Sequence, residues 1–490
     1  MLETGVPNLD LILGGGIPEG DVLLVVGPAG AGKTTLALQM AFHLAASGQN
    51  ALYISTLSEP PTRLLRHLRG FSFFDESLIG QRLFLLSTYP TIKQGLERVV
   101  DALVQAVKEY QAKLIVIDGL MAIRDLHPTT PELRGFVYEL GATLSTLECT
   151  TVLVSSGTEG PECEPFPEFT MSDGILELGR RDLGAQTLRT AQAVKMRGIS
   201  NLLGQHSMRI DSGGVTLFPR FESLFVPTDV GISSKRLQTG LPELDEMMSG
   251  GLPEGSVTLL AGSLGTGKTL ACLHYALEGV RQGEKTLIVG FRETPHQLRD
   301  KARSLGLDLE TPMKEGRVAI VHRAPVDLVV DEVLWEMRRE LERLHPQRLV
   351  LDGSADLQQA LRDGNRWAGL SASLAGVLRN QGITAVITKE VAQVIGPELD
   401  FSDTPLALLS ENLLLFRHVE FRGELYRILS ILKMRDSPHD HSIREYVITE
   451  QGMRVLARKE SSEGVLVGIA RLPSEVRVKR RRGGEGEIGT

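Results

Sequence analysis

Short, almost wholly apolar runs alternate with longer stretches of helical periodicity along most of this chain. In the first half these runs fall at residues 22–26, 52–56, 83–86, 114–117 and 151–155, and the pattern predicts a helix over 33–44. Strands that are apolar on both faces and separated by helices are typical of a parallel sheet that is covered on both sides. We therefore predict an α/β fold with a mostly parallel central sheet flanked by helices.

The whole pattern occurs twice. Thr-Gly-x-x-x-Leu-Asp at 4–10 recurs at 239–245, and Gly-Gly-x-Pro-Glu-Gly at 15–20 recurs at 250–255. The copies begin at position 4 and at position 239. This spacing is far longer than the repeats of a solenoid, which span about 20–50 residues, and therefore indicates duplicated domains. We predict one domain at 1–225 and a second at 226–460. The tail, 461–490, lacks apolar periodicity and is expected to be disordered.

Each copy carries a phosphate-binding loop between an apolar strand and a helix. The loops read Gly-Pro-Ala-Gly-Ala-Gly-Lys-Thr at 27–34 and Gly-Ser-Leu-Gly-Thr-Gly-Lys-Thr at 262–269. Glycines let backbone N–H groups close around phosphate oxygens, the lysine neutralises the outer phosphates and the hydroxyl reaches Mg²⁺. The predicted ATP contacts are Gly27, Gly30, Ala31, Gly32, Lys33, Thr34, Thr35, Gly262, Gly265, Thr266, Gly267, Lys268, Thr269 and Leu270.

An aspartate directly follows an apolar strand in each copy, Asp118 in the first and Asp352 in the second. A buried strand fixes the backbone and lets such a carboxylate meet the water shell of a metal ion. An aspartate in this place can also cap the next turn. Its recurrence behind both phosphate loops favours the metal role, so we predict Mg²⁺ sites at Thr34 with Asp118 and at Thr269 with Asp352.

The predicted strand after the phosphate-loop helix ends in a segment with a glutamate. The segment reads Ser-Glu-Pro-Pro at 58–61 and Arg-Glu-Thr-Pro at 292–295. Glu59 and Glu293 are therefore candidate general bases for the attacking water. The alternative is a glutamate that favours a helix start through the helix dipole.

The sequence Lys-Met-Arg also recurs, with Lys195 and Arg197 in the first copy and Lys433 and Arg435 in the second. Cations two residues apart on a strand point to the same face, where they can bind a phosphate of a neighbouring subunit. The alternative is a solvated basic edge strand.

Composition limits the class of protein. The chain has 490 residues, a net charge of −8, a pI near 5.9 and three cysteines. Widely spaced cysteines in odd number suggest neither a disulfide framework nor a metal site, so a cytoplasmic setting is expected. No apolar run reaches the 18 residues of a membrane helix, and no secretory signal is apparent. The acidic balance argues against non-specific nucleic-acid binding.

In series and in duplicate, these motifs resemble the KaiC-like branch of the RecA superfamily, over residues 1 to about 458. The resemblance implies two tandem RecA-like P-loop domains in a homo-oligomer of stacked six-membered rings, with ATP and Mg²⁺ between adjacent subunits. Lys33, Thr34 and Asp118 would then face Lys195, Arg197 and His206 of the next subunit. In the second ring the equivalent residues are Lys268, Thr269, Asp352, Lys433, Arg435 and His439.

Two departures from the clock members of the family bear on activity. Those proteins carry paired glutamates where this chain has Ser58-Glu59 and Arg292-Glu293. Their adjacent Ser and Thr phosphate acceptors align with Ala407 and Leu408, although Ser402, Thr404 and Ser410 lie nearby. A clock-type autophosphorylation cycle is therefore not supported, and serine/threonine kinase activity on another target stays open.

Three functions remain in competition. The leading hypothesis is a slowly hydrolysing ring ATPase that acts as a signalling or assembly switch for an unidentified partner protein. A DNA-dependent motor of RecA or ring-helicase type would need basic loops after the two aspartates, and neither loop is strongly basic. A non-hydrolysing scaffold would bind ATP and assemble without releasing phosphate.

Overall fold

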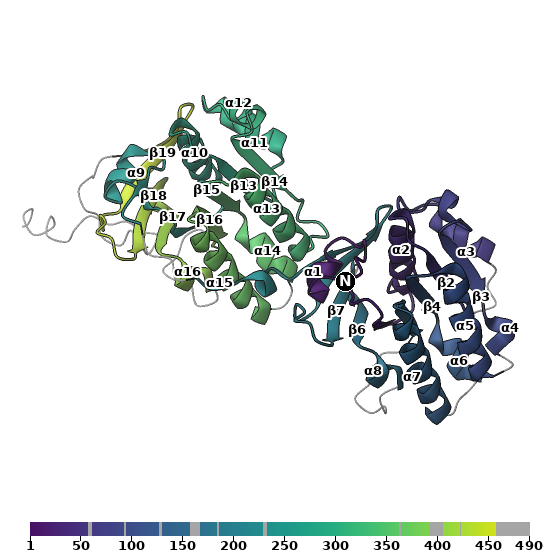
Figure 1. The fold of residues 1–490 in the computed structure, drawn as a ribbon. Helices are drawn as coiled ribbons and strands as arrows, with labels where there is room; N and C mark the ends of the chain where they lie inside the picture. The colour runs from purple at the N-terminus through teal and green to yellow at the C-terminus, as the bar shows by residue number, and fades with distance from the viewer. Residues whose placement is uncertain are drawn as a thin grey trace, which may run out of the picture. The chain divides into compact units, whose positions relative to one another are not determined.

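The structure is a computed structural model of residues 1–490, and it describes 1–56, 61–92, 95–126, 130–156, 167–183, 186–228, 233–361, 364–391, 405–421 and 423–456. It divides into two compact units, Met1–Leu224 and Phe225–Thr490 (Figure 1). Each unit holds one copy of the repeat. The predicted tail, 461–490, lies outside the described residues, as does Glu59.

The first unit is built on a nine-stranded sheet in the order β3-β2-β4-β5-β1-β6-β7-β8-β9. The six strands from β3 to β6 are parallel, and β7 to β9 add antiparallel pairs. The strands are β1 (Val22–Gly27), β2 (Ala51–Ser55), β3 (Leu83–Ser87), β4 (Leu114–Asp118), β5 (Thr150–Ser156), β6 (Gly174–Leu183), β7 (Gln186–Met196), β8 (His206–Asp211) and β9 (Gly214–Phe218).

Helices cover both faces of this sheet. They are α1 (Leu9–Leu13), α2 (Lys33–Ala46), α3 (Pro61–Leu68), α4 (Tyr89–Ile92), α5 (Leu96–Tyr110), α6 (Leu120–Leu126), α7 (Thr130–Thr146) and α8 (Pro167–Met171). Because side chains alternate along a strand, Leu23 and Val25 of β1 join the core formed with α2, whereas Leu24 joins the core formed with α5 and α7. Burial on both faces explains the unbroken apolar runs.

The second unit repeats this order as β14-β13-β15-β16-β12-β17-β18-β19-β20. Its strands are β12 (Val257–Gly262), β13 (Thr286–Gly290), β14 (Val318–His322), β15 (Arg348–Asp352), β16 (Thr384–Glu390), β17 (Asn412–Phe421), β18 (Glu424–Met434), β19 (Arg444–Thr449) and β20 (Gly452–Val455), with the short pair β10 (Arg236–Leu237) and β11 (Leu252–Pro253). Its helices are α9 (Pro242–Met247), α10 (Lys268–Arg281), α11 (Pro295–Ser304), α12 (Glu310–Lys314), α13 (Val330–Leu344), α14 (Ser354–Leu361), α15 (Gly364–Asn380) and α16 (Pro405–Leu409).

The predicted fold class is confirmed: two mostly parallel sheets, each flanked by helices, repeat one α/β architecture. The central strands β1 and β12 each lead into a phosphate loop and then into a long helix, α2 or α10. In parallel sheets ligands bind at the carboxyl ends of the strands, so this connection defines the functional edge of each unit. Among the described residues, no helix combines the length and the apolar character needed to cross a membrane.

Asp245 in α9 predicts a pH dependence of stability in the second unit. The side chain is buried and accepts hydrogen bonds from the Thr239 backbone N–H and hydroxyl, both at 2.8 Å. Burial raises its pKa from 3.8 to about 6, against the effect of those bonds. The folded protein therefore holds this proton more tightly than the unfolded chain does. The stabilisation from this group is complete below about pH 4 and is lost as the pH rises through 6.

We expect Asp245→Asn, which cannot titrate, to gain stability relative to the wild type between pH 4.5 and pH 7. Urea unfolding followed by tryptophan fluorescence measures this, since both tryptophans, Trp335 and Trp367, belong to the second unit. A constant difference between the two proteins across this pH range would contradict the assignment.

Candidate functional site

The two phosphate loops owe their shape to glycine. Gly32 precedes α2 with φ of +104°, and Gly267 precedes α10 with φ of +85°, which L side chains rarely adopt. A Cβ on Gly27 would lie 2.2 Å from the Leu178 carbonyl oxygen, and one on Gly262 would lie 2.5 Å from that of Phe416. The glycines therefore let the loop follow the neighbouring strand before it turns into the helix.

In the first unit the loop, the helix and β4 bring the predicted residues together. Lys33 Nζ donates to the carbonyl oxygens of Gly27 at 2.7 Å and Pro28 at 2.9 Å. The Thr34 hydroxyl donates to Asp118 Oδ2 at 2.7 Å. Burial lowers the pKa of Lys33 from its usual value, and the charge of Asp118 opposes that effect. The lysine is thus held in the loop, next to the hydroxyl and carboxylate pair.

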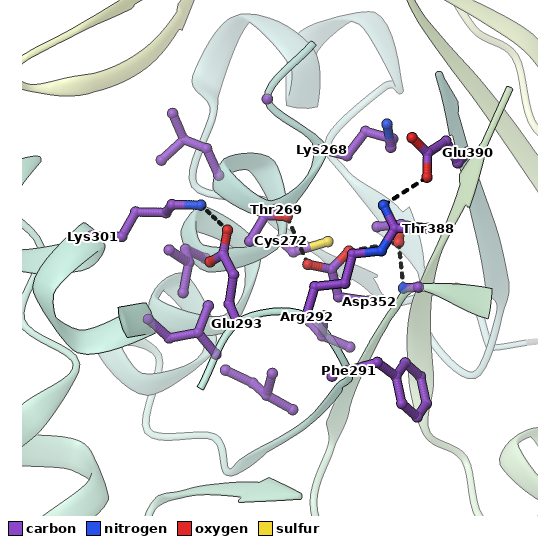
Figure 2. Close-up of a pocket in the computed structure, with 18 of the residues that line it drawn as sticks. Lys268, Thr269, Cys272, Phe291, Arg292, Glu293, Lys301, Asp352, Thr388 and Glu390 are labelled. Atoms are coloured by element: carbon purple, nitrogen blue, oxygen red, sulfur yellow. Dashed lines mark hydrogen bonds and ion pairs between the residues drawn. The ribbon is translucent and has the colours of Figure 1, made fainter. Parts of the chain in front are cut away.

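The second unit repeats this geometry around a cavity of about 590 Å³. Lys268 Nζ donates to the carbonyl oxygens of Gly262 and Ser263, both at 2.8 Å. The Thr269 hydroxyl donates to Asp352 Oδ2 at 2.7 Å (Figure 2). The pKa of Lys268 is lowered by burial, against the charges of Glu390 and Asp352. Thr269, Leu270, Gly265 and Gly267 also line the cavity.

The remaining predicted loop residues occupy supporting places. Ala31 and Thr266 are fully buried, and the Thr266 hydroxyl donates to the Ser263 carbonyl oxygen at 2.8 Å. Thr35 lies in the first turn of α2, as Leu270 does in α10, and Gly30 has a positive φ like Gly265.

The residues present fit a magnesium ion that accompanies a nucleotide. Each site joins one threonine hydroxyl to one aspartate, and the described residues contain no cluster of three or more His, Cys, Asp or Glu side chains that could hold a metal alone. Mg²⁺ commonly keeps several waters and takes one or two protein carboxylates together with phosphate oxygens. Thr34 with Asp118, and Thr269 with Asp352, would hold the ion, which neutralises phosphate charge when bound.

The sequence did not identify two further partners of the aspartates. The Tyr53 hydroxyl donates to Asp118 Oδ2 at 2.8 Å, and the Thr388 hydroxyl donates to Asp352 Oδ1 at 2.6 Å. Tyr53 comes from β2, and Thr388 from β16 beside β15. The available signal for Thr388 was its place directly after the apolar run 385–387 of β16. These bonds orient the carboxylates from opposite neighbours of the aspartate strand.

The candidate base of the second unit is bound to a lysine. Glu293 forms an ion pair with Lys301 of α11, and its exposed fraction is 30%. Arg292, directly before it, pairs with Asp356 and Glu390 in the cavity. The ammonium occupies Glu293 Oε1, one of the two oxygens that could accept a proton from the attacking water. The corresponding residue of the first unit, Glu59, lies outside the described residues, so its role stays a prediction.

The Lys-Met-Arg cations differ from the prediction in one respect. β7 ends at Met196 and β18 ends at Met434, so Arg197 and Arg435 follow their strands instead of lying on them. The prediction that both cations sit on the strand is therefore wrong. An irregularity in each hairpin leaves one extra residue before the lysine, so the alternation of side chains along the rest of the strand does not continue to the lysine.

These cations contact the turn that precedes the neighbouring strand. Lys195 Nζ donates to the Ser172 carbonyl oxygen at 2.6 Å, and Arg197 pairs with Asp173 at 2.9 Å. In the second unit Lys433 Nζ donates to the Ser410 carbonyl oxygen, also at 2.6 Å. Burial, followed by the charge of the nearby arginine, lowers the pKa of both lysines.

The two predicted histidines have different environments. His206 is fully buried at the start of β8; its Nδ1 accepts from the Arg220 backbone N–H at 3.0 Å, and its Nε2 lies 3.3 Å from the Leu202 carbonyl oxygen. A nucleotide contact by this side chain is therefore not supported, which corrects the prediction. His439 follows Lys433 by six residues, and the position at the same spacing after Lys195 holds Asn201, so His206 is not at the position that matches His439 by this spacing. His439 is half-buried and packs against His441 with ring centroids 4.4 Å apart.

The positions aligned with the clock phosphate acceptors lie in α16. Ala407 is buried and Leu408 is 72% exposed. The Ser410 side chain is buried and bonds to the Ala407 carbonyl oxygen at 3.3 Å, while Ser402 and Thr404 lie outside the described residues. Neither acceptor position therefore presents a hydroxyl.

The repeated fold and paired sites define a tandem P-loop ATPase of RecA-like architecture. A family model described as "ATPase: KaiC" matches residues 2–222 and 237–460. The chain therefore belongs to the KaiC family of ATPases, as the motifs predicted.

The chain also resembles several circadian clock oscillator proteins over nearly its whole length. It is 27% identical to KaiC of Picosynechococcus sp. over 477 residues, which cover 95% of this chain and 92% of the relative. Identity to KaiC 1 of Synechocystis sp. is 28% over 481 residues, or 95% and 91% of the two chains. KaiC of Thermosynechococcus vestitus is 27% identical over 478 residues, with the same coverage.

Proposed function

We propose that this protein is an ATP-driven assembly switch, in which ATP and Mg²⁺ at subunit interfaces join copies of the chain into a ring. The first domain hydrolyses ATP slowly, and the second mainly binds it. Nucleotide state then controls both assembly and the binding of a signalling protein. A ligand shared between subunits makes nucleotide binding and oligomerisation one coupled equilibrium.

The position of the Lys-Met-Arg cations carries this proposal. Lys195 pairs with Ile175 of β6, which pairs in turn with Leu24 of β1, whereas the phosphate loop begins at Gly27. Leu24 and Gly27 are three residues apart on β1, so Lys195 lies about 10 Å along the strands from the start of the phosphate loop. Arg197 lies further from the phosphate loop, toward the opposite ends of the strands. A phosphate bound by these cations would therefore belong to another copy of the chain. A ring of six is the size that the family resemblance suggests.

The pairing of Glu293 with Lys301, and the presence of Arg292 beside it, support slow turnover in the second domain. We do not extend the proposal to kinase activity, because the aligned acceptor positions hold Ala407 and Leu408. A DNA motor is also less favoured. Arg124, in the segment after Asp118, pairs with the buried Glu168 rather than standing in a basic loop.

Assembly should depend on Arg197. We expect the non-hydrolysable analogue AMP-PNP with Mg²⁺ to convert the wild type into a larger species, and Arg197→Ala to require about tenfold more nucleotide, corresponding to about 1.4 kcal/mol. Sedimentation velocity over a nucleotide titration measures both.

Arg303→Ala is the matched control, since Arg303 is also exposed and paired with a nearby aspartate but lies on α11. An Arg197→Ala protein that assembles like the wild type would remove this arginine from the interface. A wild type that never changes size with nucleotide would overturn the assembly proposal.

A further inference from the structure

Three charged residues of the second phosphate site have uncharged residues at the matching positions of the first. Glu390 pairs with Gly262 across the sheet as Ser156 pairs with Gly27. Asp356 stands four residues after Asp352, where the first copy has Ala122 after Asp118, and Arg292 aligns with Ser58. The cation and both of its carboxylate partners are therefore particular to one copy, which indicates that they act together.

These residues converge on the phosphate cavity from three strand ends. Arg292 follows β13, Asp356 lies in α14 after β15, and Glu390 ends β16. Arg292 Nε lies 3.2 Å from Asp356 Oδ2. Its Nη1 lies 2.8 Å from Glu390 Oε2 (Figure 2). The guanidinium thus bridges two carboxylates with different nitrogens.

The three side chains differ in solvent exposure, which indicates different roles. Asp356 is only 8% exposed, Glu390 is 23% exposed, and Arg292 remains 53% exposed although it makes both ion pairs. Arg292 and Glu390 line the cavity together with Lys268 and Thr269. Asp356 therefore anchors the guanidinium from outside the cavity lining, and Glu390 pairs with it inside the cavity.

Glu390 also faces the phosphate-loop lysine. Of the charges acting on Lys268, that of Glu390 has the largest effect on its pKa, ahead of Asp352. Glu390 thus pairs with Arg292 and lies beside Lys268, the lysine that would neutralise the outer phosphates of a nucleotide (Figure 2). Arginine binds carboxylate and phosphate oxygens with the same fork of N–H donors. The terminal phosphate can thus replace Glu390 while Asp356 keeps its hold on the guanidinium.

We propose that Arg292 binds the terminal phosphate of ATP in the second site, with Asp356 as its anchor and Glu390 as the competing anion, so that this site selects ATP over ADP. The inference rests on the proposed nucleotide binding by the second domain. ADP lacks the phosphate that would draw Arg292 from Glu390, so the arginine stays paired when ADP is bound. A cation supplied in this way by the same subunit would make the second site a sensor of the ATP state.

Competition binding tests this in the full chain carrying Lys33→Ala, which removes the phosphate-loop lysine of the first site. A fluorescent ADP is displaced by AMP-PNP or by ADP at constant Mg²⁺, and the two affinities are compared. We expect Arg292→Gln to weaken AMP-PNP binding about tenfold while ADP binding stays within about twofold. We expect Glu390→Gln, which removes the competing charge, to strengthen AMP-PNP binding at least about threefold.

A sensor predicts opposite effects of the two substitutions on AMP-PNP affinity, whereas a purely structural ion pair does not. If Arg292→Gln weakens both nucleotides equally or changes neither, and Glu390→Gln does not favour AMP-PNP, the three residues only support the fold and the proposal is wrong. If the Lys33→Ala protein binds neither nucleotide, nucleotide binding by the second domain fails and the sensor fails with it. If Lys268→Ala abolishes nucleotide binding but Arg292→Gln keeps the preference for AMP-PNP over ADP, the second domain binds nucleotide and only the sensor proposal is wrong.

Discussion

Lys33→Ala is expected to lower steady-state phosphate release from ATP by about 100-fold, whereas Lys268→Ala leaves most of it. Removing one group that stabilises developing phosphate charge costs about this factor in rate. Both lysines hold the same place in their loops, with bonds of 2.7–2.9 Å to two loop carbonyl oxygens. We expect the difference to come from the candidate base, because Lys301 pairs with Glu293 in the second site.

Phosphate release by the wild type and the two variants should be measured at equal protein concentration, with sedimentation to establish that the variants assemble. Glu59→Gln is the next variant if Lys33→Ala abolishes turnover, since Glu59 is the candidate base of the first site. Loss of activity only in Lys268→Ala would place turnover in the second domain and contradict the assignment. A wild type that binds ATP without releasing phosphate would leave the scaffold function in its place.

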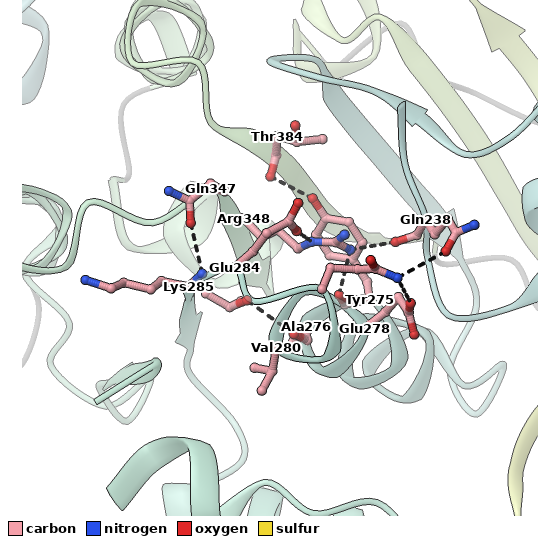
Figure 3. Close-up of polar contacts among 12 residues, drawn as sticks. Gln238, Tyr275, Ala276, Glu278, Val280, Glu284, Lys285, Gln347, Arg348 and Thr384 are labelled. Atoms are coloured by element: carbon pink, nitrogen blue, oxygen red, sulfur yellow. Dashed lines mark hydrogen bonds and ion pairs between the residues drawn. The ribbon is translucent and has the colours of Figure 1, made fainter. Parts of the chain in front are cut away.

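Arg348→Ala is expected to lower the free energy of unfolding of the second unit by about 3–5 kcal/mol, the usual cost of removing one partner from a buried ion pair. Arg348 begins β15 and is fully buried. Its Nε bonds to Glu284 at 2.5 Å and its Nη1 to the carbonyl oxygens of Gln238 at 2.6 Å and Tyr275 at 3.0 Å (Figure 3). The guanidinium carbon also lies 4.6 Å from the centre of the Tyr275 ring. Truncation would leave the Glu284 charge, 15% exposed, without this partner.

The first unit supplies a control for this change. Leu114 begins β4 where Arg348 begins β15, and Leu44 of α2 matches Gly279 of α10, in the helices that follow the phosphate loops. A Cβ on Gly279 would lie 2.5 Å from Arg348 Cδ, so the arginine needs the glycine. Arg348→Leu combined with Gly279→Leu and Glu284→Gln rebuilds the apolar pairing of the first unit and should recover much of the lost stability.

Urea unfolding followed by tryptophan fluorescence measures both proteins, because the signal comes from the second unit alone. A loss below about 1 kcal/mol for Arg348→Ala would mean that the buried network contributes no more than an exposed ion pair does.

Local patterns in the sequence were sufficient for the fold class, the duplication and both phosphate loops. The strands could be read because each is buried on both faces and thus apolar without interruption, and the loops because their chemistry uses consecutive residues. The aspartates were readable for the same reason, since Asp118 and Asp352 directly follow their strands. Each of these features depends on residues close together in the chain.

The sequence did not reveal contacts made between distant segments. Arg292, Asp356 and Glu390 span almost a hundred residues and meet only because β13, β15 and β16 lie side by side. The bond between Lys301 and Glu293 depends on the direction in which α11 leaves the sheet, and the burial of His206 on the packing of β8. Local sequence determined where nucleotide chemistry is possible, because the loops and strands are local structures. Tertiary structure decided which charges face the phosphates, because those charges come from separate strand ends.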